Sequence, residues 1–219
     1  MSLVLTAAPA VEPASLAEVK AHMRIDQIAE DAFIQSLIVT SRLHIEAALG
    51  LALIDQSWSW TIDAWPAGLA VGLPIDMQNG AIGLADQFIM RSRDAGVALP
   101  MRPVRTIDSI KLMAIDGTQS VLAPTRYVLD GTSHPARLLP RTMLLPVPAV
   151  PTQGIEINFT AGFGSLPGSV PAPIRHALLM LVAHWYENRE PVLTGERAAA
   201  IRIPDTVSEL LAPYRSVRL

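Results

Sequence analysis

Residues Ile174 to Asn188 read IRHALLMLVAHWYEN and form the most apolar stretch with helical spacing in the chain. Five apolar residues fall on one stripe of such a helix, three or four positions apart: Ile174, Leu178, Leu181, Val182 and Trp185. Four more cover much of its remaining surface: Leu179, Met180, Ala183 and Tyr186. A helix that is apolar almost all round is buried on most of its sides. We therefore expect this helix to be the central packing element of a core.

Two further helices are predicted near the N-terminus. Ser15 and Glu18 have the spacing of a capping box, which predicts a short helix from Ser15 to about Met23. A second apolar pattern with helical spacing runs from about residue 30 to residue 49, and Gly50 follows it as a natural helix stop. The N-terminal region therefore supplies a short helix and a long one.

Between these helices and the apolar helix, the apolar period changes from that of a helix to that of a strand. Trp58, Trp60 and Ile62 alternate with polar residues, and the residues from 155 to 159 do the same. Asp116-Gly117 predicts a hairpin turn between strands at 106–115 and 119–122. Shorter strands are expected at 127–129 and 136–139. After the apolar helix, Thr206 to Glu209 resembles a second capping box that opens a short last helix.

These elements predict an α+β fold, in which helices and antiparallel strands are segregated. The expected helical core combines two N-terminal helices, one long apolar C-terminal helix and a short last helix, with an antiparallel β module inserted between them. Four parts are expected: an extended N-terminal arm at 1–14, the helical core at 15–54 and 172–212, a β-rich module with Pro-rich loops at 55–171, and a C-terminal tail at 213–219. Within the module, residues 66–98 are expected to be a surface loop or an extra contact arm.

The composition indicates a globular protein whose surface is partly covered by partners. The chain has 219 residues, of which 50% are hydrophobic and only 17% charged, and its mean hydropathy is +0.34. Soluble surfaces normally carry more charge than this. Its longest uncharged run, 157–174, contains three prolines and three glycines, so it cannot be a membrane helix. No basic N-terminal region precedes Pro9 and Pro13, and we expect no signal peptide.

Charge and cysteine content exclude several other classes. There is no cysteine, so disulfides and zinc–thiolate sites are excluded. The net charge is −3, which does not point to nucleic-acid binding. Trp58, Trp60 and Trp65 could stack on nucleic acid bases, but no Lys or Arg lies between residues 43 and 90. A hydrophobic sheet face, in the core or at an interface, is the favoured interpretation of these tryptophans.

Candidate catalytic and ligand-binding residues do not form a known motif. The Gly/Pro loop at 162–173 lies between a predicted strand and a predicted helix, but Pro167 stands where a dinucleotide fingerprint needs glycine. His176 and His184 are eight residues apart on one helix, whereas a chelating pair favours a spacing of four. Ser165 lies in no G-x-S-x-G motif. We therefore expect no catalytic residue, no cofactor and no metal ion.

Several segments resemble the head–tail connector (adaptor) proteins of long-tailed phages and gene transfer agents. The resemblance covers most of the chain and depends on the order and spacing of its segments. Two acidic residues, Glu30 and Asp31, open the long helix as in that family. The remaining segments are 13–26 (PASLAEVKAHMRID), 50–54 (GLALI), 99–104 (LPMRPV), 159–164 (FTAGFG), 170–175 (VPAPIR), 184–190 (HWYENRE) and 211–215 (LAPYR).

This resemblance implies a structural role without catalysis. Adaptors form a ring, usually of twelve copies, beneath the portal of a phage or gene-transfer-agent particle assembled in the host cytoplasm. The ring extends the channel through which genomic DNA passes without sequence readout, and it docks the stopper or another tail-side neck protein. No membrane is involved.

The resemblance also suggests roles for particular residues. The helical core would build the ring, with five residues of the apolar helix as its packing residues: Leu178, Leu181, Val182, Trp185 and Tyr186. The C-terminal tail would bind the portal through Tyr214, Arg215 and Arg218, since aromatic and arginine side chains are frequent interface anchors.

Three alternatives remain open at the level of sequence. The chain could be another neck protein, a stopper or a tail terminator. It could be a small-ligand-binding protein or enzyme that uses the 162–173 loop. It could also be a DNA-binding module, whose affinity for DNA would fall steeply with salt.

Overall fold

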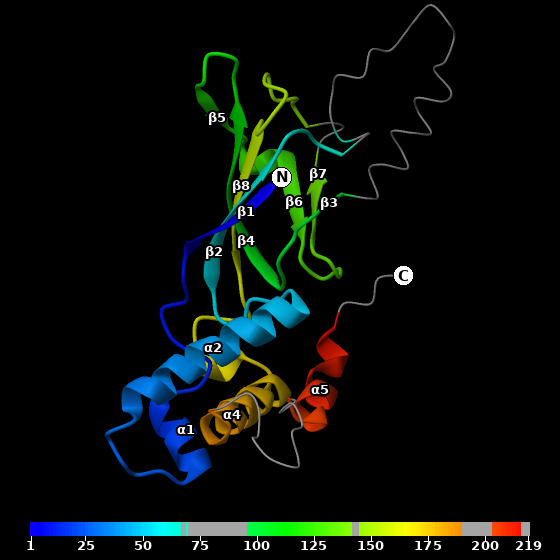
Figure 1. Cartoon of the computed structure of the whole chain (residues 1–219). Coiled ribbons are helices and arrows are strands. Elements are labelled where there is room, and N and C mark those ends of the chain that lie inside the picture. Colours follow the sequence, from blue (N-terminus) through cyan, green and yellow to red (C-terminus); the bar gives the residue numbers. More distant parts are fainter. Residues whose placement is uncertain (67–68, 70–95, 142–144, 190–202, 216–219) are drawn as a thin grey trace, which may run out of the picture. The chain divides into compact units, whose positions relative to one another are not determined.

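The segments with alternating apolar and polar residues build the larger of two antiparallel sheets. Its strand order is β1-β2-β8-β4-β5 (Figure 1). The strands are β1 (Ser2–Ala7), β2 (Gln56–Ile62), β8 (Ile155–Ala161), β4 (Val104–Met113) and β5 (Gln119–Val121). In β8 every second residue from Ile155 to Ala161 is buried, and the residues between them are half-buried. One face of this sheet therefore covers a core, and the other is polar.

The predicted hairpin between β4 and β5 is confirmed. Gly117 adopts a φ of +82°, which glycine tolerates without strain. The Asp116 carboxylate accepts hydrogen bonds from the backbone N–H and the hydroxyl of Thr118, at 2.9 and 2.7 Å. These two bonds hold the turn in the shape that the Asp-Gly pair predicts.

A second, smaller antiparallel sheet has the order β3-β7-β6. Its strands are β3 (Val97–Ala98), β7 (Arg137–Pro140) and β6 (Tyr127–Asp130). Strands β6 and β7 lie at predicted segments. Strand β3 was not predicted, because two residues are too few to show a period. Val97, Tyr127 and Leu138 are buried and give this sheet its part of the core.

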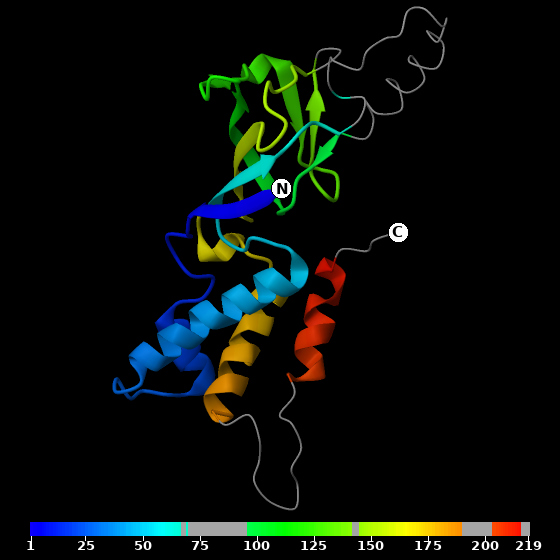
Figure 2. The same ribbon diagram turned by 45° about the horizontal axis from the view of Figure 1, so that its top comes forward.

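Within the described residues, four α-helices form a core of their own, which confirms the α+β class. They are α1 (Leu16–Met23), α2 (Asp31–Leu49), α4 (Ala172–Glu187) and α5 (Asp205–Leu211). Helix α4 packs against α1, α2 and α5, as Figures 1 and 2 show. None of the described helices is long and apolar enough to cross a membrane.

The helix ends show which capping predictions hold. The Ser15 hydroxyl accepts the N–H of Glu18 at 3.2 Å, and Gly50 ends α2 with a φ of +64°. The Glu18 carboxylate, however, forms an ion pair with Arg175 of α4. The prediction that a second capping box at Thr206–Glu209 opens the last helix is wrong. Helix α5 begins at Asp205 with Pro204 at its N-cap and no capping side chain, because Pro204 already sets the extended conformation that precedes the helix.

The chain divides into two compact units. The structure, a computed structural model, describes residues 1–66, 69, 96–141, 145–189 and 203–215. The sheet unit comprises Met1–Ala8 and Gln56–Ala161, and the helical unit comprises Pro9–Asp55 and Gly162–Leu219. Of the N-terminal segment expected to be an extended arm, residues 2–7 form the edge strand β1, paired with β2. Most of the segment at 66–98 lies outside the described residues.

The chain passes between the two units three times, at 8–9, 55–56 and 161–162, and the segments of the last two crossings are paired. Gln56 of β2 lies opposite Ala161 of β8. Beyond this pair, the N–H of Asp55 donates to the carbonyl oxygen of Gly164 at 3.0 Å, and the N–H of Phe163 donates to that of Leu53 at 3.3 Å. The antiparallel pairing thus continues beyond the ends of β2 and β8, between residues 53–55 and 163–164.

Gly162 permits this close approach. A Cβ atom at Gly162 would lie 2.5 Å from the backbone nitrogen of Asp55 and 2.6 Å from its Cα, and backbone atoms cannot swing aside as a side chain can. We predict that Gly162→Ala lowers the free energy of unfolding by about 1–3 kcal/mol, the usual cost of overpacking. The measurement is urea unfolding followed by circular dichroism.

Gly168→Ala is the matched control, because a Cβ atom at Gly168 would have no other atom within 4 Å. We expect its unfolding midpoint to match that of the unmodified chain. Equal midpoints for both variants would show that the crossing segments do not need the close approach at Gly162.

Candidate assembly surfaces

Three of the predicted packing residues of α4 belong to the core of a single copy. Leu178, Leu181 and Val182 have exposed fractions of 0% in the helical unit. Trp185 and Tyr186 are partly buried and pack at the edge of the same core. Surfaces for other proteins must therefore come mainly from residues outside this stripe.

The C-terminal tail is described only in part. Tyr214 ends a short 3-10 turn, Ala212–Tyr214, and packs half-buried against the helical core. Arg215 is exposed, and Arg218 lies outside the described residues. Of the three residues expected to bind a portal, Arg215 is therefore the one described as exposed to a partner.

The end of α4 is joined to the start of α2 by a cluster that the sequence did not reveal. We name it the α2–α4 clasp, and it consists of Glu30, Phe33, Tyr186 and Arg189. The Tyr186 hydroxyl donates a hydrogen bond to the Glu30 carboxylate, and Arg189 forms an ion pair with the same carboxylate. The Arg189 guanidinium also lies over both rings, 4.8 Å from the centre of Phe33 and 5.0 Å from that of Tyr186.

Hydrogen bonds in the clasp shift the pKa values of its members. The bond from Tyr186, followed by the bond from Arg189, lowers the pKa of the Glu30 carboxyl, and the Glu30 carboxylate raises the pKa of the Tyr186 phenol. Each group is therefore held in its usual charge state at neutral pH. The clasp therefore holds Tyr186, near the end of α4, and Arg189, just after it, against the start of α2.

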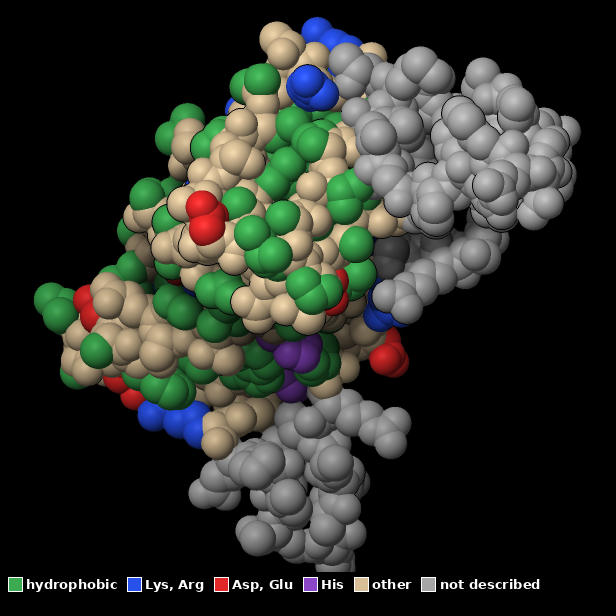
Figure 3. All heavy atoms as spheres, turned by 90° about the horizontal axis from the view of Figure 1, so that it is seen from above, with side chains coloured by type: hydrophobic (Ala, Val, Ile, Leu, Met, Phe, Trp, Pro, Cys, Tyr) green, Lys and Arg blue, Asp and Glu red, His purple; other side chains and the backbone are tan. Residues whose placement is uncertain are grey.

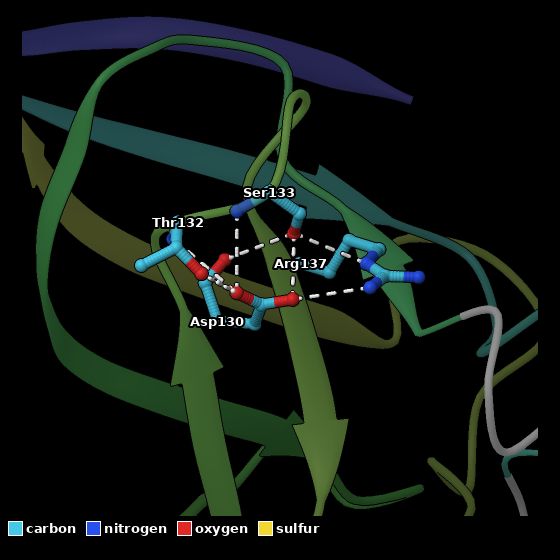
Figure 4. Close-up of polar contacts among 4 residues, drawn as sticks. All are labelled: Asp130, Thr132, Ser133 and Arg137. Carbon is cyan, nitrogen blue, oxygen red and sulfur yellow. Dashed lines mark hydrogen bonds and ion pairs between the residues drawn. The ribbon is translucent and has the colours of Figure 1, made fainter.

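A second polar cluster shapes the loop between β6 and β7 (Figure 4). The Asp130 carboxylate accepts the hydroxyls of Ser133 and Thr132, at 2.7 and 2.8 Å, and the backbone N–H groups of both residues. Arg137 donates to the same carboxylate at 3.1 Å and to the Ser133 hydroxyl at 3.2 Å. The hydroxyls of Ser133 and Thr132, together with Arg137, hold the pKa of Asp130 far below its usual range.

A third cluster ties the N-terminal segment to α2. Arg42 is 5% exposed and donates to Glu12 and to Glu46, each at 2.8 Å. The other oxygen of Glu46 accepts the N–H of Leu53 at 2.9 Å. Burial opposes the charge of Arg42, but its hydrogen bonds and ion pairs with the two carboxylates outweigh burial and raise the pKa of the guanidinium.

The two histidines of α4 contact neighbouring side chains, and the Gly/Pro loop takes part in backbone pairing. The ring of His176 lies edge-on to that of His22, with centres 6.1 Å apart, and His184 contacts Asn188. Within the described ranges, no three His, Asp or Glu side chains gather as they would around a metal ion. In the 162–173 loop, Gly162 and Gly164 lie at the backbone pairing with residues 53–55.

Comparisons with known proteins agree with one another. The family model described as "Phage gp6-like head-tail connector protein" matches residues 13–71. A chain of the "Virion of native gene transfer agent (GTA) particle" is 26% identical with a TM-score of 0.71, over 100% of this chain and 97% of that chain. The family match and the structural matches together support a head–tail connector of a phage or gene transfer agent particle. No curated protein gives a significant match.

Two further structures match this connector over the same shares of the chains, 100% and 97%. The "Neck of empty GTA particle computed with C6 symmetry" contains a chain that is 27% identical, with a TM-score of 0.70. The "Neck of native GTA particle computed with C12 symmetry" contains one that is 26% identical, with a TM-score of 0.64. The likeness therefore extends over both units.

One face of the chain carries few charges, in line with a composition in which 17% of the residues are charged. Figure 3 shows a face on which hydrophobic and neutral polar side chains predominate, and Lys, Arg, Asp and Glu are sparse. Several of the charged residues are paired within the chain, among them Arg42, Arg175 and Arg189. Such a surface is better suited to contacts with protein than with the phosphates of DNA.

The clasp predicts an order of stability among variants of Arg189. Arg189→Ala removes both the ion pair with Glu30 and the stacking on two rings, and we expect a clear fall in melting temperature. Arg189→Lys keeps the charge but loses the planar guanidinium, so we expect an intermediate value. Arg126→Ala, at an exposed arginine of the sheet unit, is the control. Equal melting temperatures for Arg189→Lys and the unmodified chain would show that the stacking of the planar guanidinium contributes nothing.

The Asp130 cluster predicts a pH dependence. Because the folded-state pKa of Asp130 is lowered, its contribution to stability is present above the unfolded-state pKa of about 3.9 and is lost as pH falls below it. We expect Asp130→Asn to melt below the unmodified chain at pH 7, and the difference to shrink steadily below about pH 4. Differential scanning calorimetry from pH 7 to pH 2.5 measures it. A difference that stays constant with pH would contradict the assigned role of the carboxylate.

Proposed function

We propose that this connector forms a ring beneath the portal in the neck of a phage or gene transfer agent particle. The observation that carries the proposal is the match over 100% of the chain to neck chains at 26–27% identity. Those necks were computed with C6 and C12 symmetry. A ring of twelve identical subunits obeys both symmetries, and we therefore propose twelve copies. The ring would be assembled in the host cytoplasm and then become part of the particle.

The chemistry of the chain supports a structural role in this ring. The net charge of −3 and the sparse surface cations favour a channel through which DNA passes without being held or read. The low surface charge also suits a subunit with neighbours on two sides, because a closed ring joins two different faces of each copy.

We assign separate partners to the parts of the chain. The helical unit would supply the ring contacts, and the sheet unit would face outward or toward the tail and dock the next neck protein, a stopper. The C-terminal tail would bind the portal through Tyr214, Arg215 and Arg218. Tyr214 is already packed against its own core, so Arg215 is the described residue of the three that is most available to a partner.

This assignment predicts the outcome of co-expression with the portal protein of the same gene cluster. Electron microscopy of the purified complex should show a second ring stacked on the portal. The double variant Arg215→Ala/Arg218→Ala should lose most of its portal binding, whereas Arg126→Ala/Arg141→Ala, at exposed arginines of the sheet unit, should bind like the unmodified chain.

Two results would contradict the proposal in different ways. Unchanged portal binding by the Arg215/Arg218 variant would overturn the role of the tail. A bare portal, together with rings of this chain on a tail tube, would show that the protein is a stopper or tail terminator.

A further inference from the structure

The outward side of α2 carries no charged residue. Ten of the nineteen residues of the helix are exposed: Ala32, Phe33, Gln35, Ser36, Val39, Thr40, Leu43, His44, Ala47 and Ala48. We call this set the α2 face. Leu43 is 51% exposed, and Phe33 and Val39 are each 36% exposed. An exposed helix side normally carries charged and strongly polar residues.

The charged residues of α2 are all engaged elsewhere. Asp31, in the first turn, pairs with Lys20 of α1. Arg42 and Glu46 are buried and paired with each other. The helix therefore does carry charge, but its three charged side chains lie on or near its inner side and not on the α2 face.

The polar groups of the α2 face are partly satisfied within the helix. The Ser36 hydroxyl donates to the carbonyl oxygen of Phe33 at 2.7 Å, and the Thr40 hydroxyl donates to that of Ser36 at 2.8 Å. Neither hydroxyl therefore needs a donor bond to water. The middle of the face presents methyl and methylene groups between small residues, and a protein surface can bury such a face with little loss of hydration.

We propose that the α2 face packs against the neighbouring copy of this chain in the ring. This inference rests on the proposed function and names the surface that joins the subunits. DNA is a poor occupant, since the face includes no lysine or arginine and the Arg189 guanidinium that lies over Phe33 is paired with Glu30. A neighbouring copy suits it because neck structures with chains like this one have C6 and C12 symmetry, and a cyclic ring covers two different faces of every subunit.

The size of the face agrees with a contact that is repeated around a ring. A helix of nineteen residues is about 28 Å long and about 10 Å wide, so the face offers on the order of 300 Å² of flat area. A standard interface buries about 800 Å² on each partner. The α2 face would therefore supply a large part of one lateral contact, and other segments would complete it.

The inference is tested in cells that produce the particle, with full-length chains in place of the native copy. Leu43 is replaced by the photo-reactive residue p-benzoyl-phenylalanine, assembled particles are purified and irradiated, and cross-linked peptides are identified by mass spectrometry. The same replacement at Ser208, an exposed residue of α5, is the matched control. We expect a covalent adduct between two copies of this chain through position 43.

The other outcomes separate the two proposals. Particles that contain this chain but give no adduct at position 43, or an adduct only with a different particle protein, would overturn the inference and leave the proposed function intact. Particles that lack this chain altogether would overturn the proposed function and the inference with it.

A charge placed on the α2 face gives an independent measure. Leu43→Arg should leave the melting temperature of the isolated chain unchanged, because position 43 is exposed. In the assembling system it should reduce the fraction of the chain found in rings about tenfold or more, since burying an unpaired charge is strongly unfavourable. Ser208→Arg should assemble normally. Normal ring assembly by Leu43→Arg would contradict the inference.

Discussion

The antiparallel pairing of β2 with β8 is the constraint on which the rest of the structure depends. These strands lie about a hundred positions apart in the sequence, and every residue from Gln56 to Ile62 has a partner between Ile155 and Ala161. The pairing continues into Leu53–Asp55 and Phe163–Gly164, which already belong to the helical unit. It therefore brings α2 and α4 together, although the whole sheet unit separates them along the chain. Gly162 is required at this point because the neighbouring backbone leaves no room for a Cβ atom.

The helical unit uses several of its charges internally. Arg42 binds Glu12 and Glu46, Arg175 binds Glu18, and Arg189 binds Glu30. Each pair joins segments that are distant in the sequence or successive turns of one helix, so that charge serves the fold of a single copy. This use of charge leaves the α2 face neutral. The ion pairs thus join parts of a single copy, and the exposed side of α2 carries apolar and small side chains.

Elements with a strong local pattern were predictable from the sequence, and elements made by pairing were not. The Ser15 cap, the Gly50 stop, the Asp116-Gly117 hairpin and the alternation in β8 each depend on residues a few positions apart. Strand β1 was expected only as extended chain, because its hydrogen-bond partner lies more than fifty residues away in β2. The predicted cap at Thr206 failed because Pro204, which lies outside the motif, is the N-cap residue and sets where the helix begins.

By itself, the sequence determined the α+β class, most of the helices and strands, and the resemblance to head–tail connectors, since these follow from local periodicity and from ordered motifs. Only the tertiary structure decided how the motifs are used. It showed that Tyr186 and Arg189 build the α2–α4 clasp with Glu30 and Phe33. It also showed that Leu178, Leu181 and Val182 are enclosed within one copy. It also showed which side of α2 is left outward. The physical reason is that burial and ion pairing are properties of residues brought together from distant segments, which a local pattern cannot specify.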